Sequence, residues 1–180
     1  MVENPKEIEL IAFPGAPNLP IYAADRLGFF ENLGVQVNLT TTTSSPYQVE
    51  NLVAGKFQIA GTAIDNVIAY QEGQGAIELN REPDLFVFMG ATKIELSFAV
   101  SPDIGSYEDL KGKTLAMDAL ATGFAFVLYH MLEQAGLTPE DTTLVAVGAT
   151  PQRWDSVKSG EHAGTLLIEP FTSMARNEGY

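Results

Sequence analysis

The chain has 180 residues, 46% of them hydrophobic and 18% charged, a composition typical of a globular protein that buries a core. Its net charge of −13 argues against nucleic acid or an anionic membrane as a partner, because both recognise basic surfaces. The absence of cysteine excludes disulfides, thiolate metal sites and cysteine nucleophiles.

The length allows one large α/β domain or two small lobes. No stretch approaches ~18 uninterrupted apolar residues, so we expect no membrane insertion. Residues 1–7 contain no apolar segment of the kind found in a signal peptide.

Strands and helices are expected to alternate in the first half of the chain. Segments in which apolar residues recur at every second position alternate with segments in which they recur about every 3.6 positions. The expected elements are a strand at 7–13, a helix from Pro20 to Leu27, a strand at 35–39, a helix from Ser45 to about Val53, a strand at 57–61 and a helix that begins at Thr62. Ser45 and Gln48 fit a capping box at the start of their helix.

The middle of the chain contains a polar connector at residues 76–83 and then two expected strands. The continuous apolar run at 85–90 predicts a buried strand, and a second strand is expected at 95–100. A boundary between them, near residues 91–94, divides the chain into one lobe at 1–92 and another at 93–180.

The second half is expected to alternate in the same way. The expected elements are a short helix after Ser106, a strand at 114–117, a long helix from about Gly123 to Ala135, a strand at 143–147, a helix after Thr150 and a strand at 163–168. Strands that alternate with helices throughout predict mostly parallel sheets covered by helices.

One strand–loop–helix–strand pattern occurs twice, at residues 35–61 and at residues 143–168. In each copy a Ser-Pro or Thr-Pro pair opens the helix and a glycine, Gly55 or Gly160, ends it. The repetition predicts two similar α/β lobes, and a cleft between two lobes is a common place for a small ligand.

Four short motifs follow one another in the order seen in a known family. They are the segment from Asn18 to Tyr22 with Leu27-Gly-Phe-Phe-Glu31, Asn51-Leu-Val-Ala-Gly55 with Gly61-Thr62, Ser106-Tyr-Glu-Asp-Leu-Lys-Gly-Lys113, and Glu169-Pro-Phe171. Over essentially its whole length the chain resembles the solute-binding proteins of ABC importers, in the branch for nitrate, sulfonates, taurine and thiamine-pyrimidine precursors.

The resemblance implies a two-lobed α/β fold of the periplasmic-binding-protein type II class, located in the periplasm or elsewhere outside the cytoplasm. Its partners would be a small-molecule ligand and an ABC permease in the membrane. Family members return to the first lobe after the second, and that C-terminal return segment is missing here. Either the chain is a fragment, or another chain or segment completes the first lobe.

Ligands of such folds meet helix N-termini and the loops that follow strands, where free amides favour negative or polar groups. The resemblance places the ligand contacts of the family on these same segments. The candidate ligand-binding residues are Asn18, Tyr22, Gly61, Thr62, Asp65, Thr92, Ala121, Thr122, Gly123 and Glu169.

Several candidates also have an ordinary structural role. Asn18 fits an N-cap as well as a ligand contact. Thr62 fits a helix cap whether or not its hydroxyl also faces the ligand. For Asp65 a role in a capping box is favoured over ligand contact. Tyr22 could stack on a ligand or pack against its neighbours, and Thr92 could serve the hinge or the ligand.

Charge placement favours one ligand class. Glu169 at the edge of the cleft, with Asp65 nearby, would repel nitrate or a sulfonate, and the candidate segments contain no Arg or Lys. Arg153 is expected to face solvent. A neutral, zwitterionic or amine-bearing heterocyclic molecule is therefore expected rather than a simple oxyanion.

The enzyme alternatives have little support in the sequence. His130 and His162 are both expected at the surface, and no hydrolase, P-loop or dinucleotide motif is present. Asp118 could act as a base, but a cap or hinge hydrogen bond is favoured. We expect a binding receptor with no catalytic residue, metal or cofactor; an enzyme on the same fold and a sensor domain of a regulator remain as alternatives.

Overall fold

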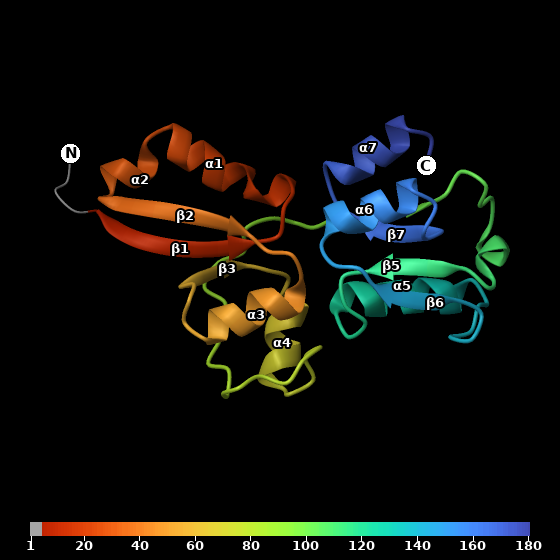
Figure 1. Cartoon of the computed structure of the whole chain (residues 1–180). Helices are drawn as coiled ribbons and strands as arrows, with labels where there is room; N and C mark the ends of the chain where they lie inside the picture. The colour runs from red at the N-terminus through yellow and green to blue at the C-terminus, as the bar shows by residue number, and fades with distance from the viewer. Residues whose placement is uncertain (1–4) are drawn as a thin grey trace.

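The computed structural model describes residues 5–180 and contains two separate β-sheets (Figure 1). The first sheet is parallel, in the order β2–β1–β3, and consists of β1 (Lys6–Ala12), β2 (Val35–Thr41) and β3 (Ile59–Gly61). The second, in the order β4–β7–β5–β6, consists of β4 (Ser97–Val100), β5 (Thr114–Met117), β6 (Thr143–Ala146) and β7 (Gly164–Leu167). Only β4 runs antiparallel to its neighbour.

Helices cover both faces of each sheet. They are α1 (Leu19–Arg26), α2 (Phe29–Asn32), α3 (Ser45–Val53), α4 (Ile64–Gln71), α5 (Gly123–Gln134), α6 (Thr150–Lys158) and α7 (Phe171–Asn177), with short 3-10 turns η1 (Ala16–Asn18) and η2 (Tyr107–Leu110). In Figure 1, α1 and α2 lie above the first sheet with α3 and α4 below it, while α6 and α7 lie above the second sheet with α5 below it. The expected two-lobed α/β fold is confirmed. We call β1 to α4 the first lobe and β4 to α7 the second lobe.

The repeated pattern has the same role in both lobes. In the first lobe β2, α3 and β3 flank the central strand β1, and in the second lobe β6, α6 and β7 flank the central strand β5. Gly55 and Gly160 end the two helices with φ angles of 81° and 76°, which glycine adopts without steric cost. Each central strand therefore ends beside the loop that precedes the repeated helix.

The second lobe has the larger core. Its main cluster joins strands β5 and β7 to helix α5 through buried side chains of Leu115, Met117, Leu128, Leu132 and Leu166, among others. A second cluster places Trp154 of α6 against β7. The first lobe buries a smaller cluster around Val49, Val53 and Tyr70.

The prediction of a buried strand at residues 85–90 is wrong for this chain. The segment forms no strand, and Phe86 and Met89 are 80% and 65% exposed. An extended segment needs a neighbouring strand for its backbone hydrogen bonds, and among residues 5–180 β3 pairs only with β1. The strand expected at 95–100 is confirmed as β4, and no helix in the described part of the chain is long and apolar enough to cross a bilayer.

Candidate functional site

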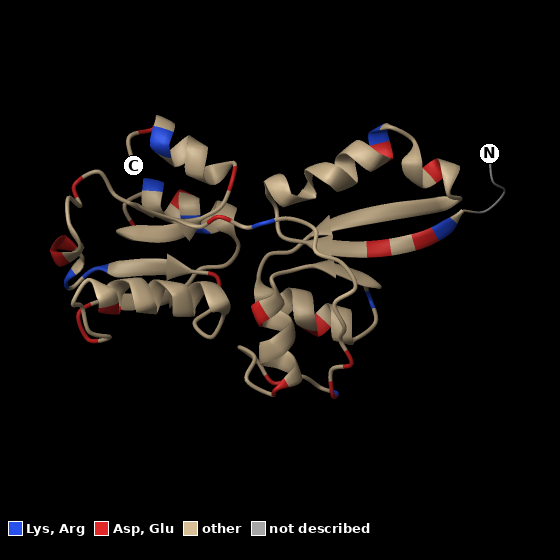
Figure 2. Ribbon diagram, turned by 180° about the vertical axis from the view of Figure 1, so that it is seen from behind, with Lys and Arg blue, Asp and Glu red and all other residues tan. Residues whose placement is uncertain are grey.

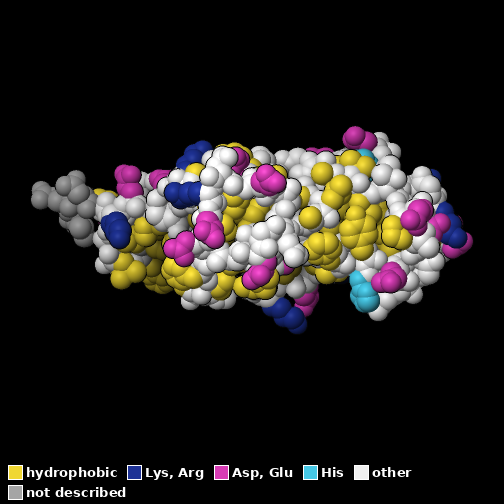
Figure 3. Space-filling model, turned by 90° about the horizontal axis from the view of Figure 1, so that it is seen from below, with side chains coloured by type: hydrophobic (Ala, Val, Ile, Leu, Met, Phe, Trp, Pro, Cys, Tyr) yellow, Lys and Arg dark blue, Asp and Glu magenta, His cyan; other side chains and the backbone are white. Residues whose placement is uncertain are grey.

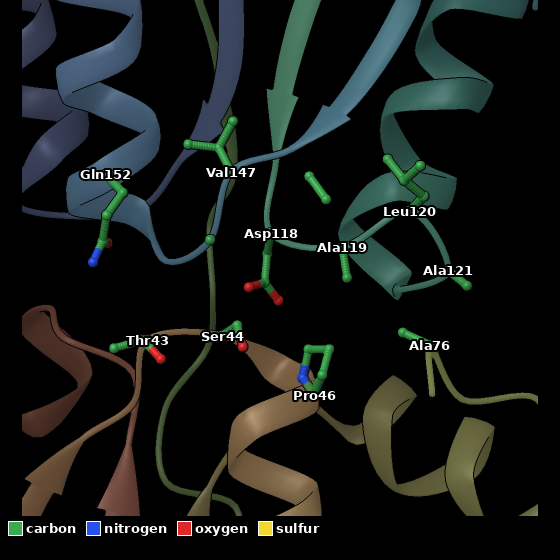
Figure 4. Close-up of a pocket in the computed structure, with 12 residues that line it drawn as sticks. Thr43, Ser44, Pro46, Ala76, Asp118, Ala119, Leu120, Ala121, Val147 and Gln152 are labelled. Atoms are coloured by element: carbon green, nitrogen blue, oxygen red, sulfur yellow. The ribbon is translucent and has the colours of Figure 1, made fainter. Parts of the chain in front are cut away.

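A cavity of about 620 Å³ lies between the two lobes and is lined by both of them (Figure 4). Its size is within the usual range for small-molecule sites. The first lobe contributes Thr43, Ser44 and Pro46, the connector after α4 contributes Ala76, and the second lobe contributes Asp118, Ala119, Leu120, Ala121, Ala146, Val147, Gly148 and Gln152. The lining is therefore mainly apolar, with a few hydroxyl and amide groups and one charged side chain.

Most of the lining comes from loops that follow parallel strands. Thr43 and Ser44 follow β2, residues 118–121 follow β5, and residues 147–148 follow β6. The carboxyl ends of parallel strands are the usual position of ligand sites in open α/β sheets. The carboxyl-terminal edges of both sheets therefore face the same cavity.

Asp118 is the charged residue of the lining, and it is held by the opposite lobe. Its carboxylate accepts hydrogen bonds from the backbone N–H of Ser45 at 3.2 Å and from the Ser45 hydroxyl. Burial raises the pKa of Asp118 above its ordinary value, and the hydrogen bonds from Ser45 oppose that rise in part. This carboxyl group is therefore a buried acceptor inside a mainly apolar cavity.

A second contact between the lobes joins two helix N-termini. The carboxylate of Asp65, in the first turn of α4, accepts a hydrogen bond of 2.7 Å from the backbone N–H of Gly123, the first residue of α5. This N–H is one of the groups that α5 itself leaves unpaired, and a carboxylate also interacts favourably with the helix dipole. A side chain at Gly123 would overlap the carboxylate, since its Cβ would lie 2.4 Å from the Asp65 Cγ.

Two backbone hydrogen bonds complete the contact between the lobes. Ala149 N–H donates to the carbonyl of Thr43 at 2.9 Å, and Ala16 N–H donates to the carbonyl of Glu169 at 3.0 Å. Four separate positions thus connect the lobes around the cavity. The facing edges of the two lobes are therefore in direct contact at these positions.

Arg153 supports one wall of the cavity from behind. The sequence predicted that it faces solvent, but it is only 2% exposed and lies under the loop that follows β6. Its guanidinium donates to the carbonyls of Gly148 and Leu166 at 3.0 and 2.6 Å, and to the hydroxyls of two threonines, Thr150 and Thr165. Burial lowers its pKa to about 10. The solvent prediction rested on the position of Arg153 near a helix start, and it is wrong because this end of α6 packs against β7.

The structure brings together four of the ten candidate residues. Ala121 lines the cavity, and Thr122, Gly123 and Asp65 lie at the adjoining junction between α4 and α5. Thr122 is the N-cap of α5, and its hydroxyl accepts from the N–H of Ala125 at 3.4 Å. Of the ten predicted ligand-binding residues, these four therefore lie in the cavity lining or directly beside it.

Gly61 and Thr62 lie behind the lining. The Gly61 carbonyl accepts a hydrogen bond of 3.1 Å from the buried side chain of Gln48, and the Thr62 hydroxyl accepts one of 2.9 Å from Asn66. The capping role predicted for Thr62 is wrong, because α4 begins at Ile64 with Ala63 as its N-cap. The capping box predicted for Asp65 is also wrong, since its carboxylate is bonded to Gly123 of the other lobe.

The other four candidates lie outside the cavity lining. Asn18 is buried and donates to the carbonyl of Phe13 at 2.7 Å, so it makes no side-chain cap. Tyr22 and Thr92 are exposed, and the Glu169 carboxylate accepts from the N–H and hydroxyl of Ser173. None of the four is among the residues that line the cavity.

Sequence reasoning missed much of the lining. Ser44 rather than Ser45 is the N-cap of α3, which leaves the Ser45 hydroxyl free to reach Asp118. Gly148 and Gln152 belong to no reactive motif, so the sequence did not predict them. The available signal was that Gly148 lies in the loop after β6 and Gln152 in the first turn of the helix that follows, at the carboxyl edge of a parallel sheet.

The two histidines are not part of the cavity. His130 is exposed as expected, whereas His162 is buried with its Nδ1 2.9 Å from the hydroxyl of Thr114, so its predicted exposure is wrong. Within residues 5–180, no cluster of three or more His, Asp or Glu side chains has the geometry of a metal site.

Comparison with known proteins decides the family. Residues 17–161 match the profile of the family described as NMT1/THI5 like. The chain belongs to this family. A search against curated protein sequences gives no match.

Solved structures share the fold of this NMT1/THI5-like chain. The periplasmic nitrate-binding protein NrtA from Synechocystis PCC 6803 has a TM-score of 0.83 at 15% identity, over 98% of this chain and 50% of NrtA. The alkanesulfonate-binding protein SsuA from Xanthomonas axonopodis pv. citri, bound to MOPS, has a TM-score of 0.70 at 15% identity, over 99% of this chain and 60% of SsuA. A protein from Bordetella bronchiseptica RB50 has a TM-score of 0.72 at 21% identity, over 98% of this chain and 55% of its own.

These similarities establish the type II periplasmic-binding-protein fold for the chain. The chain spans 50% to 60% of the length of these three proteins.

Proposed function

We propose that the chain is the ligand-binding part of an extracytoplasmic receptor of an ABC importer. It would bind a small organic molecule in the cavity between the lobes, and closure of the lobes around that molecule would be recognised by a membrane permease. The observation that carries the proposal is the cavity itself, whose lining is drawn from loops of both lobes.

The lobe division at residues 92 and 93 is part of this proposal. Residues 85–96 contain no strand or helix and are mostly exposed, which supports a boundary in this segment. The exposed apolar side chains of Phe86 and Phe88, beside a first lobe with a small core, also support the expectation that further polypeptide completes that lobe.

The chemistry of the lining supports a ligand with a hydrogen-bond donor. Asp118 can only accept hydrogen bonds when it is ionised, and no Lys or Arg lines the cavity to hold an anion. Thr43, Ser44 and Gln152 offer further neutral polar contacts. An amine-bearing or heterocyclic molecule therefore suits the cavity better than nitrate or a sulfonate does.

A thermal-shift screen tests the ligand class. The panel contains nitrate, taurine, ethanesulfonate, benzylamine, an aminopyrimidine and benzoate. A ligand present at 100 times its Kd stabilises the folded state by about 2.7 kcal/mol, which corresponds to a rise of about 5–10 °C in Tm for a chain of this size.

We expect such a rise with the amine or the aminopyrimidine, and its loss in Asp118→Asn. Asp103→Asn, at an exposed carboxylate outside the cavity, is the matched control. A rise with nitrate or the sulfonates alone would contradict the ligand class, and no rise with any compound of a wider panel would contradict a receptor.

The buried Asp118 also supports a second candidate function, an enzyme on the same fold. A carboxyl group whose pKa is raised by burial can exchange a proton with a bound molecule at a pH nearer neutrality. Mass spectrometry of each stabilising compound after incubation separates the two functions. An unchanged compound supports the receptor, whereas a product supports the enzyme.

A further inference from the structure

A series of buried hydrogen bonds extends from the cavity into the first lobe. The Asp118 carboxylate accepts from the hydroxyl of Ser45, and the Ser45 oxygen in turn accepts from the side-chain amide of Asn66 at 3.3 Å. The same amide nitrogen donates to the hydroxyl of Thr62 at 2.9 Å. Asp118, Ser45 and Asn66 are only 8%, 2% and 5% exposed. Polar side chains of α3 and α4 are therefore joined to the loop after β5 by contacts that are mostly shielded from solvent.

The direction of these hydrogen bonds is fixed by what each group can donate. A hydroxyl has one hydrogen, and within residues 5–180 the hydroxyl hydrogen of Ser45 has no acceptor other than Asp118. The Ser45 oxygen then offers only lone pairs to α4, so Asn66 must present its N–H group there rather than its carbonyl oxygen. Thr62 accepts the second hydrogen of the same nitrogen and thereby fixes the plane of the amide. Asn66 therefore holds the Ser45 hydrogen toward Asp118.

The charged form of Asp118 depends on these neutral donors. Burial raises its pKa, the hydrogen bonds from Ser45 and the guanidinium of Arg153 lower it, and the carboxylate of Asp65 raises it further. The hydroxyl of Tyr70 on α4 is another titratable group that interacts with this charge. Helices α3, α4 and α5 contain no Lys or Arg, and Figure 2 shows red but no blue on them. Ser45 and Arg153 are thus the groups that oppose the effect of burial.

Apolar side chains cover this region from the outside. In Figure 3, which views the molecule from the side of α4 and α5, hydrophobic side chains gather over the second lobe and continue toward the first. A hydrogen bond is stronger in surroundings of low dielectric constant than in water, and a buried polar group that loses its partner is correspondingly costly. The orientation of Asn66 should therefore influence Asp118 more strongly than an exposed contact of the same length would.

We propose that Asn66 is a positioning residue for the ligand site. Through the Ser45 hydroxyl it holds the Asp118 carboxylate as a hydrogen-bond acceptor at the cavity, which gives the site its preference for a ligand with a hydrogen-bond donor. Asn66 does not itself line the cavity, so it acts on the ligand only through Asp118. The proposal rests on the proposed function and deepens it, because it assigns part of the ligand preference to a residue of α4.

Carbon-13 NMR of the aspartate carboxyl groups tests this role in the protein without ligand. The signal of Asp118 is the one missing from Asp118→Asn, and its titration midpoint is compared in wild type, Asn66→Leu and Asn51→Leu. Asn51 is the matched control, because its amide donates at 2.7 Å to the carbonyl of Tyr47 within α3. We expect the midpoint to rise by about one pH unit in Asn66→Leu and to be unchanged in the control. An unchanged midpoint in Asn66→Leu overturns the proposal.

A double-mutant cycle identifies the route of the effect. Ser45→Ala should raise the midpoint by itself, and the addition of Asn66→Leu should produce no further rise. Two additive rises would show that Asn66 acts without Ser45 and would overturn the proposal. Thr62→Val keeps the shape of its side chain, so it tests the same link if Asn66→Leu does not fold. A smaller rise in Thr62→Val supports the proposal, and no rise overturns it.

Calorimetric titration with benzylamine connects Asn66 to the ligand. The ammonium group of benzylamine keeps its charge between pH 4 and 7, so a loss of affinity within this range reports a protonation of the protein. We expect the pH at which binding weakens to be about one unit higher in Asn66→Leu than in wild type or Asn51→Leu. The same pH profile in all three proteins would overturn the effect on the ligand.

The two measurements separate this proposal from the proposed function. Failure of the wild type to bind either benzylamine or the aminopyrimidine contradicts the proposed ligand class, whereas the NMR titration still supports or overturns the role of Asn66. Binding of benzylamine with an unchanged midpoint in Asn66→Leu leaves the receptor intact and overturns the positioning role.

Discussion

The carboxylate of Asp65 lies 2.7 Å from the backbone nitrogen of Gly123, so a side chain of one lobe satisfies a helix terminus of the other. We expect Asp65→Ala to lower the free energy of unfolding by about 1 kcal/mol, as the loss of a helix cap does. Urea denaturation measures this. Small-angle X-ray scattering should show a larger radius of gyration for the variant, because one of the contacts that close the lobes is lost.

Asp65→Asn is the control for this prediction, since its amide oxygen can still accept from Gly123 while the charge is removed. It should retain most of the compactness of the wild type. An Asp65→Ala protein with the stability and radius of the wild type would show that the contact does not hold the lobes.

Gly123 should tolerate a side chain only when Asp65 is absent. A Cβ at Gly123 would lie 2.4 Å from the Asp65 Cγ, so Gly123→Ala should destabilise the wild type. In an Asp65→Gly background the same change should be neutral or stabilising, since alanine favours a helix over glycine by about 1 kcal/mol. A double-mutant cycle should give a coupling of about 0.5–3 kcal/mol, and additive effects would contradict the predicted overlap.

The pH dependence of stability should include a contribution from Asp118. Its pKa is raised in the folded state, so folding favours its protonated form. The stability of the wild type relative to Asp118→Asn should therefore fall as the pH rises from near the ordinary value of 3.8 toward neutrality. Urea midpoints of both proteins between pH 4 and 7 measure the difference.

The exposed Asp103→Asn variant is the reference for that comparison. A difference between wild type and Asp118→Asn that is constant with pH, or that grows in favour of the wild type, would contradict a raised pKa.

Arg153 should be among the least replaceable residues of the second lobe. Replacing it with Met leaves the carbonyls of Gly148 and Leu166 without their donors, and each unsatisfied buried group costs about 1–3 kcal/mol. We expect a loss of roughly 3 kcal/mol in urea denaturation, and a similar loss for Arg153→Lys, which cannot reproduce the planar fork. Arg176→Met, at an exposed position of α7, should change stability by less than about 0.5 kcal/mol.

The fold could be predicted because its signals are local. The repeated helices of α3 and α6 are bounded within ten residues by a proline and a glycine, and both were found with nearly correct limits. The strand expected at 85–90 failed for a reason that is not local. A strand exists only where another strand accepts its hydrogen bonds, and its own composition cannot supply that neighbour.

The site was predicted less well, for the same physical reason. A capping box is recognised from residues three positions apart. Ser45 and Asp118, however, form a hydrogen bond although they are 73 positions apart, and Asp65 and Gly123 form one although they are 58 positions apart. Both side chains were assigned to nearby amides that they do not bind. Family resemblance indicated the segment from Ala121 to Gly123, of which Ala121 lines the cavity, but it could not distinguish lining residues from the residues behind them.

The path of the chain between the lobes has a mechanical consequence. Within the described residues the polypeptide crosses from the first lobe to the second once, through the strand-free segment 85–96. This segment lacks regular structure, so by itself it sets no fixed orientation of one sheet relative to the other. Within residues 5–180 that orientation is held by the polar contacts of Asp118 with Ser45 and of Asp65 with Gly123 on the two facing edges.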